Sequence, residues 1–417
     1  MSGLSESLKA GPCGLKGGWW FRCVLFAAAL TIGLSGCRQE PPPIKERRSG
    51  KEPVMRVKVA GPAQAVSFGI NGAFTVFDSK RHPLAQGPYL PEGQVRPQGQ
   101  SIQLGGATVA VSDFIDIVPN RNGDLRINQA RYPGSLRLHR LGDGQLMAVN
   151  HVLVEEYLKG VIPGELPPRF QAETCKAQAI AARTYALYEK ATRSGPSRQY
   201  DVTDGESSQV YKGLEGRTDR GNNAVDQTRG IVLTGSTRNG WRIFPAFFSS
   251  TCGGWTQGAQ HLAAIDPEFR PLQGEVECKG CTISKYRRWD EMRMPLAELT
   301  QRVNEKLGKS FQRIVNVQVA RRSRYGRAIQ VKVTDVSGAA VLVPGEKFRL
   351  IAGPRVMRST CCSLRVEGDE LVMYDGQGFG HGVGMCQWGA EGMARQGHTA
   401  VEILLHYYPS ANLVRAY

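Results

Sequence analysis

The stretch from Gly160 to Lys190 constrains the fold most, because three prolines surround one acid just before a long helical pattern. Proline fixes its own φ angle and pushes the preceding residue towards an extended conformation. Pro163, Pro167 and Pro168 therefore predict a stiff, irregular loop, and this loop holds Glu165.

A helix is expected from about Arg169 to Lys190, because this segment is rich in good helix formers and has no internal glycine or proline. Lys176 and Arg183 are two helical turns apart, so they share one face. One interpretation is a rigid loop with an acid, beside a helix face with two cations. The other is an ordinary loop and a surface helix, since exposed Lys and Arg are the rule.

The leader of the chain indicates export. Basic residues precede the apolar run VLFAAALTIGL, and the sequence LSGC then ends at Cys37. A short apolar region behind a basic head predicts a secretory signal rather than a membrane span. The LSGC ending resembles a bacterial lipobox, in which the cysteine is acylated; a plain secretory signal is the alternative. We expect an exported cell-envelope lipoprotein that contacts the membrane only through its lipid anchor.

The formal net charge of +16 favours a polyanionic partner. Nucleic acid, anionic lipid and acidic cell-wall polymer all carry the required charge. Because export argues against nucleic acid, we expect the cell wall to be the partner.

The length of 417 residues is too great for one compact core, so several lobes are expected. Alternating apolar patterns and turn signals predict an α+β fold, with mixed β-rich lobes around a central helix and an added small α/β lobe. The predicted segments are a signal (1–37), a linker (38–53), a β-rich part (54–150), a central part with the acid and the helix (151–290), an inserted α/β lobe (291–352) and a final part with a glycine-rich loop and a C-terminal helix (353–417).

The cysteines allow a metal site. Seven of them follow Cys37, and an odd number in an exported protein leaves at least one thiol unpaired or metal-bound. Cys278 and Cys281 form a C-x-x-C pair that, together with Cys252, can supply three thiolates to a zinc ion, with His261 as the candidate fourth ligand. A disulfide and free thiols are the alternatives.

The segment from Tyr374 to Ala394 predicts a ligand-binding loop. Six glycines fall between Gly376 and Gly389, with His381 and Gln387 among them, and such a stretch is typical of a tight loop laid along a ligand. Aromatic and amide side chains beside closely approaching backbone suit a sugar. A core histidine in a glycine-rich turn is the alternative.

Together these segments resemble the stage II sporulation protein D family, which includes amidase-enhancer relatives. The matching motifs GVIPGELPPRF, KAQAIAARTYAL, FFSSTCGGWT and GQGFGHGVGMCQWGAEGMA occur in the family's order, and the resemblance spans about residues 54–417. It implies a lytic transglycosylase that acts on peptide-stripped glycan strands of peptidoglycan and requires no cofactor. The alternative is a non-catalytic, wall-binding enhancer of an N-acetylmuramoyl-L-alanine amidase.

The resemblance also assigns roles to residues. The family's acid falls on Glu165, and cations important for its activity fall on Lys176 and Arg183. In two places the chain departs from the common family pattern: Ser249 replaces a histidine linked to metal binding in some members, and Cys386 replaces a serine. The other residues expected to contact the glycan are Ser250, Thr251, Gly378, His381 and Gln387.

One acid is enough for this reaction, because the substrate's own C6 hydroxyl is the nucleophile. Glu165 must begin protonated near neutral pH, so burial should raise its pKa. Nearby cations would lower that pKa, and we therefore expect Lys176 and Arg183 to bind the lactyl carboxylate of stripped muramic acid. The competing interpretation for Arg183 is a structural ion pair with Asp201 or Asp204.

Overall fold

The computed structural model describes residues 45–46, 50–104, 107–111, 113–120, 123–142, 144–193, 195, 198–238, 240–262 and 269–417. The predicted signal and its Cys37 lie outside these residues. Within the described part of the chain, no helix is long and apolar enough to cross a bilayer. The elements confirm a mixed α+β fold.

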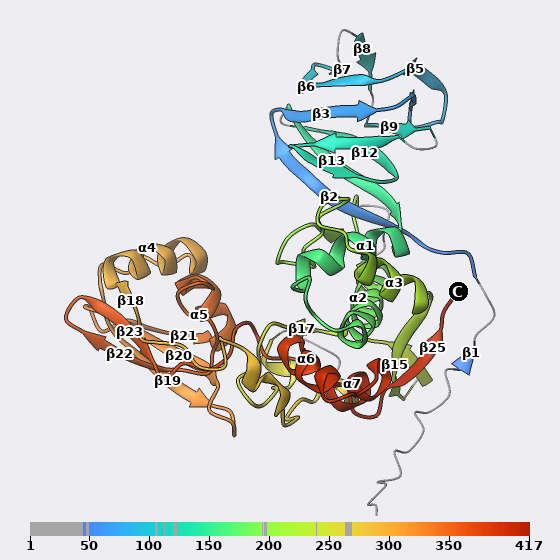
Figure 1. The fold of residues 1–417 in the computed structure, drawn as a ribbon. Coiled ribbons are helices and arrows are strands. Elements are labelled where there is room, and N and C mark those ends of the chain that lie inside the picture. Colours follow the sequence, from blue (N-terminus) through green and yellow to red (C-terminus); the bar gives the residue numbers. More distant parts are fainter. Residues whose placement is uncertain are drawn as a thin grey trace, which may run out of the picture. The chain divides into compact units, whose positions relative to one another are not determined.

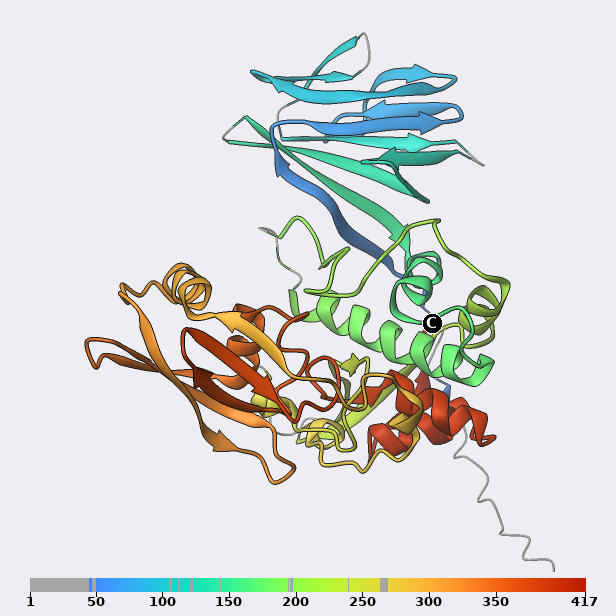
Figure 2. The same ribbon diagram turned by 60° about the vertical axis from the view of Figure 1, so that its left-hand side comes forward.

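Two sheets form the β-rich part, in the strand orders β11-β10-β3-β6-β7-β8 and β14-β2-β13-β12-β9-β4-β5. Figures 1 and 2 show β3 and β6 lying over β9, β12 and β13. Alternate apolar side chains of both sheets point inward and share one core. The strands are β2 (Val54–Ala63), β3 (Val66–Asn71), β4 (Phe74–Phe77), β5 (Pro83–Gly87), β6 (Leu90–Gln98), β7 (Ser101–Leu104), β8 (Ala107–Ala110), β9 (Phe114–Pro119), β10 (Asp124–Ile127), β11 (Ala130–Tyr132), β12 (Ser135–Leu141), β13 (Gln145–Leu153) and β14 (Val202–Thr203).

Strand β13 leads directly into α1 (Val154–Glu165), which differs from the expected loop around the acid. Glu165 is the last residue of this helix, and Pro163 lies inside its final turn. The prediction of an irregular loop around Glu165 was therefore wrong. Leu166, the residue before Pro167, does have the extended backbone that a following proline favours, and the helix ends there.

The predicted long helix is α2 (Ala172–Arg193), and it begins slightly later than expected. It is buried along most of its length and packs against α1, α3 (Asp219–Gln227) and β15 (Ile231–Thr237). Figure 1 shows this central position. The helix is therefore mostly buried, with fully exposed residues only at its two ends, in contrast to the alternative of a surface helix.

A buried ion pair fixes α2 to α1. Arg183 is fully buried, and its Nε and Nη2 donate to Glu155 Oε1 and Oε2 at 3.0 and 2.6 Å. Glu155 Oε1 also accepts from Gly230 N and from Tyr417 Oη, at 3.0 and 2.6 Å. This one carboxylate therefore connects two helices, the start of β15 and the described end of the chain.

A second core lies on the other side of α2 and contains the glycine-rich segment. A short parallel ladder joins β17 (Phe248–Ser249) to β24 (Met385–Cys386). The predicted C-terminal helix is confirmed as α7 (Ala400–Tyr407). The remaining elements here are β1 (Lys45–Glu46), β16 (Gly240–Ile243), β25 (Asn412–Arg415), α6 (Gln387–Arg395) and the 3₁₀ turns η1 (Ala259–His261), η2 (Arg270–Leu272) and η3 (Gly280–Ile283).

The added lobe has its own core and two three-stranded sheets. The amphipathic pattern of this segment predicts a helix from Leu296 to Leu307, and α4 (Leu296–Leu307) confirms it. The core includes Leu371 and Met373, so the lobe extends beyond the expected boundary at residue 352. Its other elements are β18 (Met292–Pro295), β19 (Ile314–Arg322), β20 (Ala328–Asp335), β21 (Ala340–Pro344), α5 (Gly345–Ala352), β22 (Ser363–Glu367) and β23 (Glu370–Tyr374).

Replacing Arg183 by methionine should lower the free energy of unfolding by about 3–5 kcal/mol, because Glu155 would stay buried without its cation. Urea unfolding followed by circular dichroism measures this loss. Lys306→Met is the control, since Lys306 pairs with Glu305 at an exposed site, and it should change little. Equal losses in the two variants would contradict a structural role for the buried pair.

Candidate active site

Glu165 lines an open cleft of about 520 Å³. The cleft brings together the end of α1, the segment around residue 208, the segment around β17, the glycine-rich loop and the start of α6. Aromatic, hydroxyl and charged side chains share its wall. The lining residues are Gly164, Glu165, Pro167, Arg169, Phe170, Glu206, Ser208, Val210, Phe248, Ser249, Ser250, Lys285, Tyr286, Phe379, Gly380, His381, Gln387 and Trp388.

The carboxyl group of Glu165 is held from two sides. Its Oε1 accepts from Val210 N at 2.9 Å, and its Oε2 accepts from Gln387 Nε2 at 3.2 Å. Burial raises the pKa of Glu165, the two hydrogen bonds offset part of that rise, and the charge of Glu206 adds to it. The raised pKa increases the protonated fraction near neutral pH, as a general acid requires.

Two glycines in α1 make this arrangement possible. A Cβ atom on Gly164 would lie 2.1 Å from Val210 O, and one on Gly160 would lie 2.5 Å from Gly213 O. The helix therefore contacts the 210–213 segment backbone to backbone. This close approach brings Val210 N within hydrogen-bond distance of Glu165, and it explains both glycines of the GVIPGE motif.

The glycine-rich loop lies against the segment that carries β17. Phe379 and Thr251 exchange backbone hydrogen bonds of 2.8 and 3.0 Å. Gly384 has a φ of +68°, and a Cβ there would lie 2.0 Å from Phe247 O. The structure thus bears out a tight loop up to Gly384. From Gln387 onward, however, the chain is helical, so the expectation of one continuous loop was wrong.

His381 is a neutral member of the cleft wall. Its Nδ1 accepts from Val383 N at 3.1 Å, and burial lowers its pKa to about 4. An imidazole in this state carries no charge at neutral pH. It can therefore contact a sugar without competing with Glu165 for protons.

The structure brings four of the expected site residues to the cleft: Glu165, Ser250, His381 and Gln387. Thr251 and Gly378 lie behind its wall. Thr251 is fully buried, with its Oγ1 2.8 Å from Ser284 Oγ, and Gly378 O accepts from Trp289 Nε1 at 3.0 Å. These two positions support the loop rather than face a ligand.

The two expected cations lie elsewhere. Lys176 Nζ donates to Glu173 Oε1 at 2.8 Å, and Arg183 is enclosed with Glu155. The expectation that Arg183 binds a substrate carboxylate was wrong, because its guanidinium is fully buried and satisfied inside the fold. The partner in the competing interpretation was also wrong, since Asp201 pairs with Arg56 and Lys190 instead.

Two other cations line the cleft. Arg169 is exposed and lies over the ring of Trp388 at 5.5 Å, and Lys285 is exposed and lies over Tyr286 at 5.1 Å. Neither residue was among those expected at the site. Arg169 directly follows the paired prolines after the acid, so proximity to Glu165 was a usable signal. Lys285 had no comparable signal.

Aromatic pairs provide apolar faces along the cleft. Phe170 and Trp388 meet edge to face with ring centroids 4.9 Å apart, and Tyr286 stacks on Phe379 at 4.8 Å. Aromatic rings beside hydroxyl and amide groups suit a carbohydrate, which presents apolar ring faces and polar edges.

A cluster of four buried cysteines lies behind the cleft. The Sγ atoms of Cys252, Cys278, Cys281 and Cys386 all lie within 4.8 Å of one another, so the cluster can hold a metal ion. Its fourth member is Cys386 and not His261, whose partly buried ring lies on η1 with Nε2 3.5 Å from Gln260 Nε2. The expected histidine ligand was therefore wrong, while the three expected cysteines do meet.

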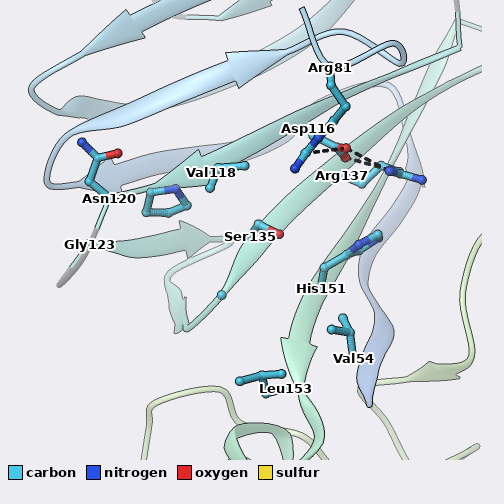
Figure 3. A pocket seen from close by; sticks show the side chains of 12 residues that line it. Val54, Arg81, Asp116, Val118, Asn120, Gly123, Ser135, Arg137, His151 and Leu153 are labelled. Carbon is cyan, nitrogen blue, oxygen red and sulfur yellow. Dashed lines mark hydrogen bonds and ion pairs between the residues drawn. The ribbon is translucent and has the colours of Figure 1, made fainter. Parts of the chain in front are cut away.

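A separate cavity of about 730 Å³ lies on the β-rich part (Figure 3). Arg137 there donates from Nε and Nη2 to the two carboxylate oxygens of Asp116, at 2.7 and 2.9 Å. Arg81 approaches the same carboxylate at 3.5 Å. The one acid shown here is thus already paired with cations, so this cavity is a weaker candidate for acid catalysis than the Glu165 cleft.

Comparisons with known proteins indicate the family. The family described as Stage II sporulation protein matches residues 142–234, and a domain of unknown function matches residues 274–384. An uncharacterised protein of Brachyspira hyodysenteriae is 30% identical over 304 residues, covering 72% of this chain and 76% of that protein.

Two relatives with informative names are similar over a comparable length. Stage II sporulation protein D of Bacillus amyloliquefaciens is 30% identical over 285 residues, covering 64% of this chain and 76% of the relative. The amidase enhancer of Bacillus subtilis is 28% identical over 295 residues, covering 61% of this chain and 40% of the relative.

The pKa of Glu165 should lie above the ordinary glutamate value, and Glu206→Gln should lower it by removing a nearby negative charge. Carbon-13 NMR of labelled glutamate carboxyl groups, titrated with pH, measures both. Glu305→Gln, which changes an exposed acid paired with Lys306, is the control and should leave the titration unchanged. An ordinary pKa in the parent protein would contradict the arrangement described.

Proposed function

The chain belongs to the stage II sporulation protein D family, and from this premise we propose that it is a lytic transglycosylase of peptidoglycan. The observation that carries the proposal is one partly buried carboxyl group with a raised pKa, held by Val210 and Gln387 in an aromatic-walled cleft. We infer that its substrate is a glycan strand stripped of stem peptides.

Glu165 serves first as acid and then as base. The protonated carboxyl donates its proton to the glycosidic oxygen as the bond to C1 of the muramic acid breaks. The resulting carboxylate then takes the proton of the C6 hydroxyl, whose oxygen bonds to C1 and closes a 1,6-anhydro ring. The nucleophile belongs to the same sugar, so its effective concentration is high and no second carboxylate is needed.

The two hydrogen bonds to Glu165 fit both of its roles. Val210 N and Gln387 Nε2 can orient the carboxyl group when it donates its proton. They stabilise the carboxylate once the proton has left, which keeps the base close to the C6 hydroxyl. Glu165 supplies the acid and the substrate supplies the nucleophile, so we propose that the reaction needs no cofactor. Zinc is proposed only as a structural ion in the cysteine cluster.

We propose that Arg169 and Lys285 bind the lactyl carboxylates of the stripped strand. Removal of the stem peptide exposes a lactyl carboxylate on each muramic acid, and these two exposed cations line the cleft. A guanidinium can bind a carboxylate through two parallel hydrogen bonds. This role replaces the one expected for Lys176 and Arg183.

The second candidate function is a non-catalytic, wall-binding enhancer of an amidase. The similarity to the Bacillus subtilis amidase enhancer favours it. Incubation of the purified protein with stripped glycan separates the two candidates, because 1,6-anhydro ends form only if this chain is itself the enzyme. For either function we propose export to the cell envelope and anchoring through an acylated Cys37.

Glu165→Gln should fold normally and lose cleavage by about 10²-fold or more, because the change keeps the shape of the side chain but removes its acidic proton. Mass spectrometry of products from stripped glycan, with circular dichroism of the variant, measures activity and folding separately. Glu305→Gln is the control and should keep full activity. A folded Glu165→Gln protein with wild-type activity would exclude Glu165 as the acid.

Arg169→Gln should weaken binding to stripped strands by several-fold to about tenfold, with the loss limited by the solvent exposure of this cation. It should change binding little when the lactyl carboxylates have been amidated. Lys176→Gln is the matched control, since Lys176 pairs with Glu173, and it should alter neither affinity. Equal losses of Arg169→Gln for both glycans would show that Arg169 does not read the carboxylate.

A further inference from the structure

We propose that Cys252, Cys278, Cys281 and Cys386 bind one zinc ion, and that this ion fixes the wall of the Glu165 cleft. The proposal of the zinc site depends only on the geometry of the cysteines. Only its consequence for cleavage rests on the proposed function.

The sulfur positions fit tetrahedral zinc. A Zn–S bond is about 2.3 Å long, which places tetrahedral sulfurs roughly 3.8 Å apart. The Sγ atoms of Cys252 and Cys281 are 3.9 Å apart, and all four sulfurs lie within 4.8 Å of one another. Cys278 and Cys281 also have the C-x-x-C spacing found in structural zinc sites.

Hydrogen-bond donors surround the sulfurs. Cys386 Sγ accepts from Cys252 N at 3.2 Å and from Gly389 N at 3.3 Å, and Cys252 Sγ accepts from Gly254 N at 3.4 Å. Tyr407 Oη lies 3.0 Å from Cys278 Sγ. Donors of this kind stabilise thiolates and orient metal ligands. These donors reach Cys252, Cys278 and Cys386, and they suit thiolates that share a cation better than neutral thiols.

Close backbone packing brings the fourth ligand into place. Cys386 caps the N-terminus of α6, and this helix packs directly on η3, which contains Cys281 of the C-x-x-C pair. A Cβ on Gly280 would lie 2.4 Å from Gly389 O, and one on Gly392 would lie 2.2 Å from Gly280 O. Only glycine allows the two segments to approach this closely. These glycines, which a sugar-binding loop does not require, are explained by the metal site.

Two of the proposed ligands adjoin the cleft. Cys386 directly precedes Gln387, whose Nε2 donates to Glu165 Oε2. Cys252 follows Ser250, and β17 pairs with β24 through Ser249 and Cys386. One ion bound by both cysteines would hold these segments in register. It would thereby fix the distance between Gln387 and the catalytic carboxyl group.

Zinc suits this donor set because thiolates are soft ligands and zinc accepts tetrahedral sulfur without redox chemistry. Metal analysis of the purified full chain should find one zinc per chain. Cys386→Ser should lower that content severalfold, whereas Cys361→Ser should keep it, because Cys361 lies outside the cluster. Iron in place of zinc, two disulfides in a thiol titration, or full zinc in Cys386→Ser would each overturn the proposal.

The effect of zinc removal on the cleft can be measured by thermal unfolding and hydrogen exchange, without an activity assay. Zinc removal from the wild-type protein by a chelator should lower the melting temperature and speed hydrogen exchange in residues 247–252 and 385–389. Exchange in β3 of the β-rich part should stay unchanged. Wild-type chelation also serves as the test if Cys386→Ser does not fold. Unchanged exchange near the cleft after zinc loss would overturn the positioning role.

The test separates this inference from the proposed function. Glu165→Gln should keep its zinc and its exchange pattern while losing cleavage. A wild-type protein that is purified without any zinc and still cleaves glycan would refute the metal site and leave the proposed enzyme standing. A zinc-loaded protein that never cleaves glycan would refute the proposed enzyme and leave the metal site standing.

Discussion

The catalytic carboxyl group depends on backbone contacts that only glycine permits. Gly164 places the end of α1 against Val210, and Gly384 places the returning loop against Phe247. A side chain at either position would push these segments apart by more than a hydrogen bond tolerates. The cleft is therefore built from segments that are distant in the sequence, and glycines, which have no side chain, allow these segments to come close together. Val210 N and Gln387 Nε2 can then donate hydrogen bonds to Glu165 from two sides.

The buried pair of Arg183 and Glu155 provides the frame for these contacts. It fixes α1 to α2, and α1 ends at Glu165, so a shift of α1 would carry the acid with it. The cations of the protein therefore have two different roles. The buried cation stabilises the fold, while Arg169 and Lys285 remain at the surface of the cleft. The pKa of Glu165 stays raised because the carboxyl group is buried and lies near the negative charge of Glu206.

Sequence patterns predicted the features that depend on local chemistry. The α+β class, the helices α4 and α7, and the tight loop up to Gly384 follow from periodicity and glycine content. The role of Arg183 did not follow, because a helical pattern shows which residues share a face but not what covers that face. Cys386 was missed as a metal ligand for a similar reason. Its neighbours come from the pairing of β17 with β24, which joins distant segments and has no local signal.

The insertion of the added lobe provides a second physical reason for a metal cross-link at the cysteine cluster. The chain leaves the cleft wall after Tyr286, builds the lobe, and returns to the same wall at Phe379. Keeping the two ends of a long insertion together costs conformational entropy, and a cross-link between them offsets that cost. Three of the proposed zinc ligands, Cys252, Cys278 and Cys281, lie before the lobe, and the fourth, Cys386, lies after the chain returns from it. A metal bound there would close the insertion at its base, so the lobe could move or vary without displacing Gln387 from Glu165.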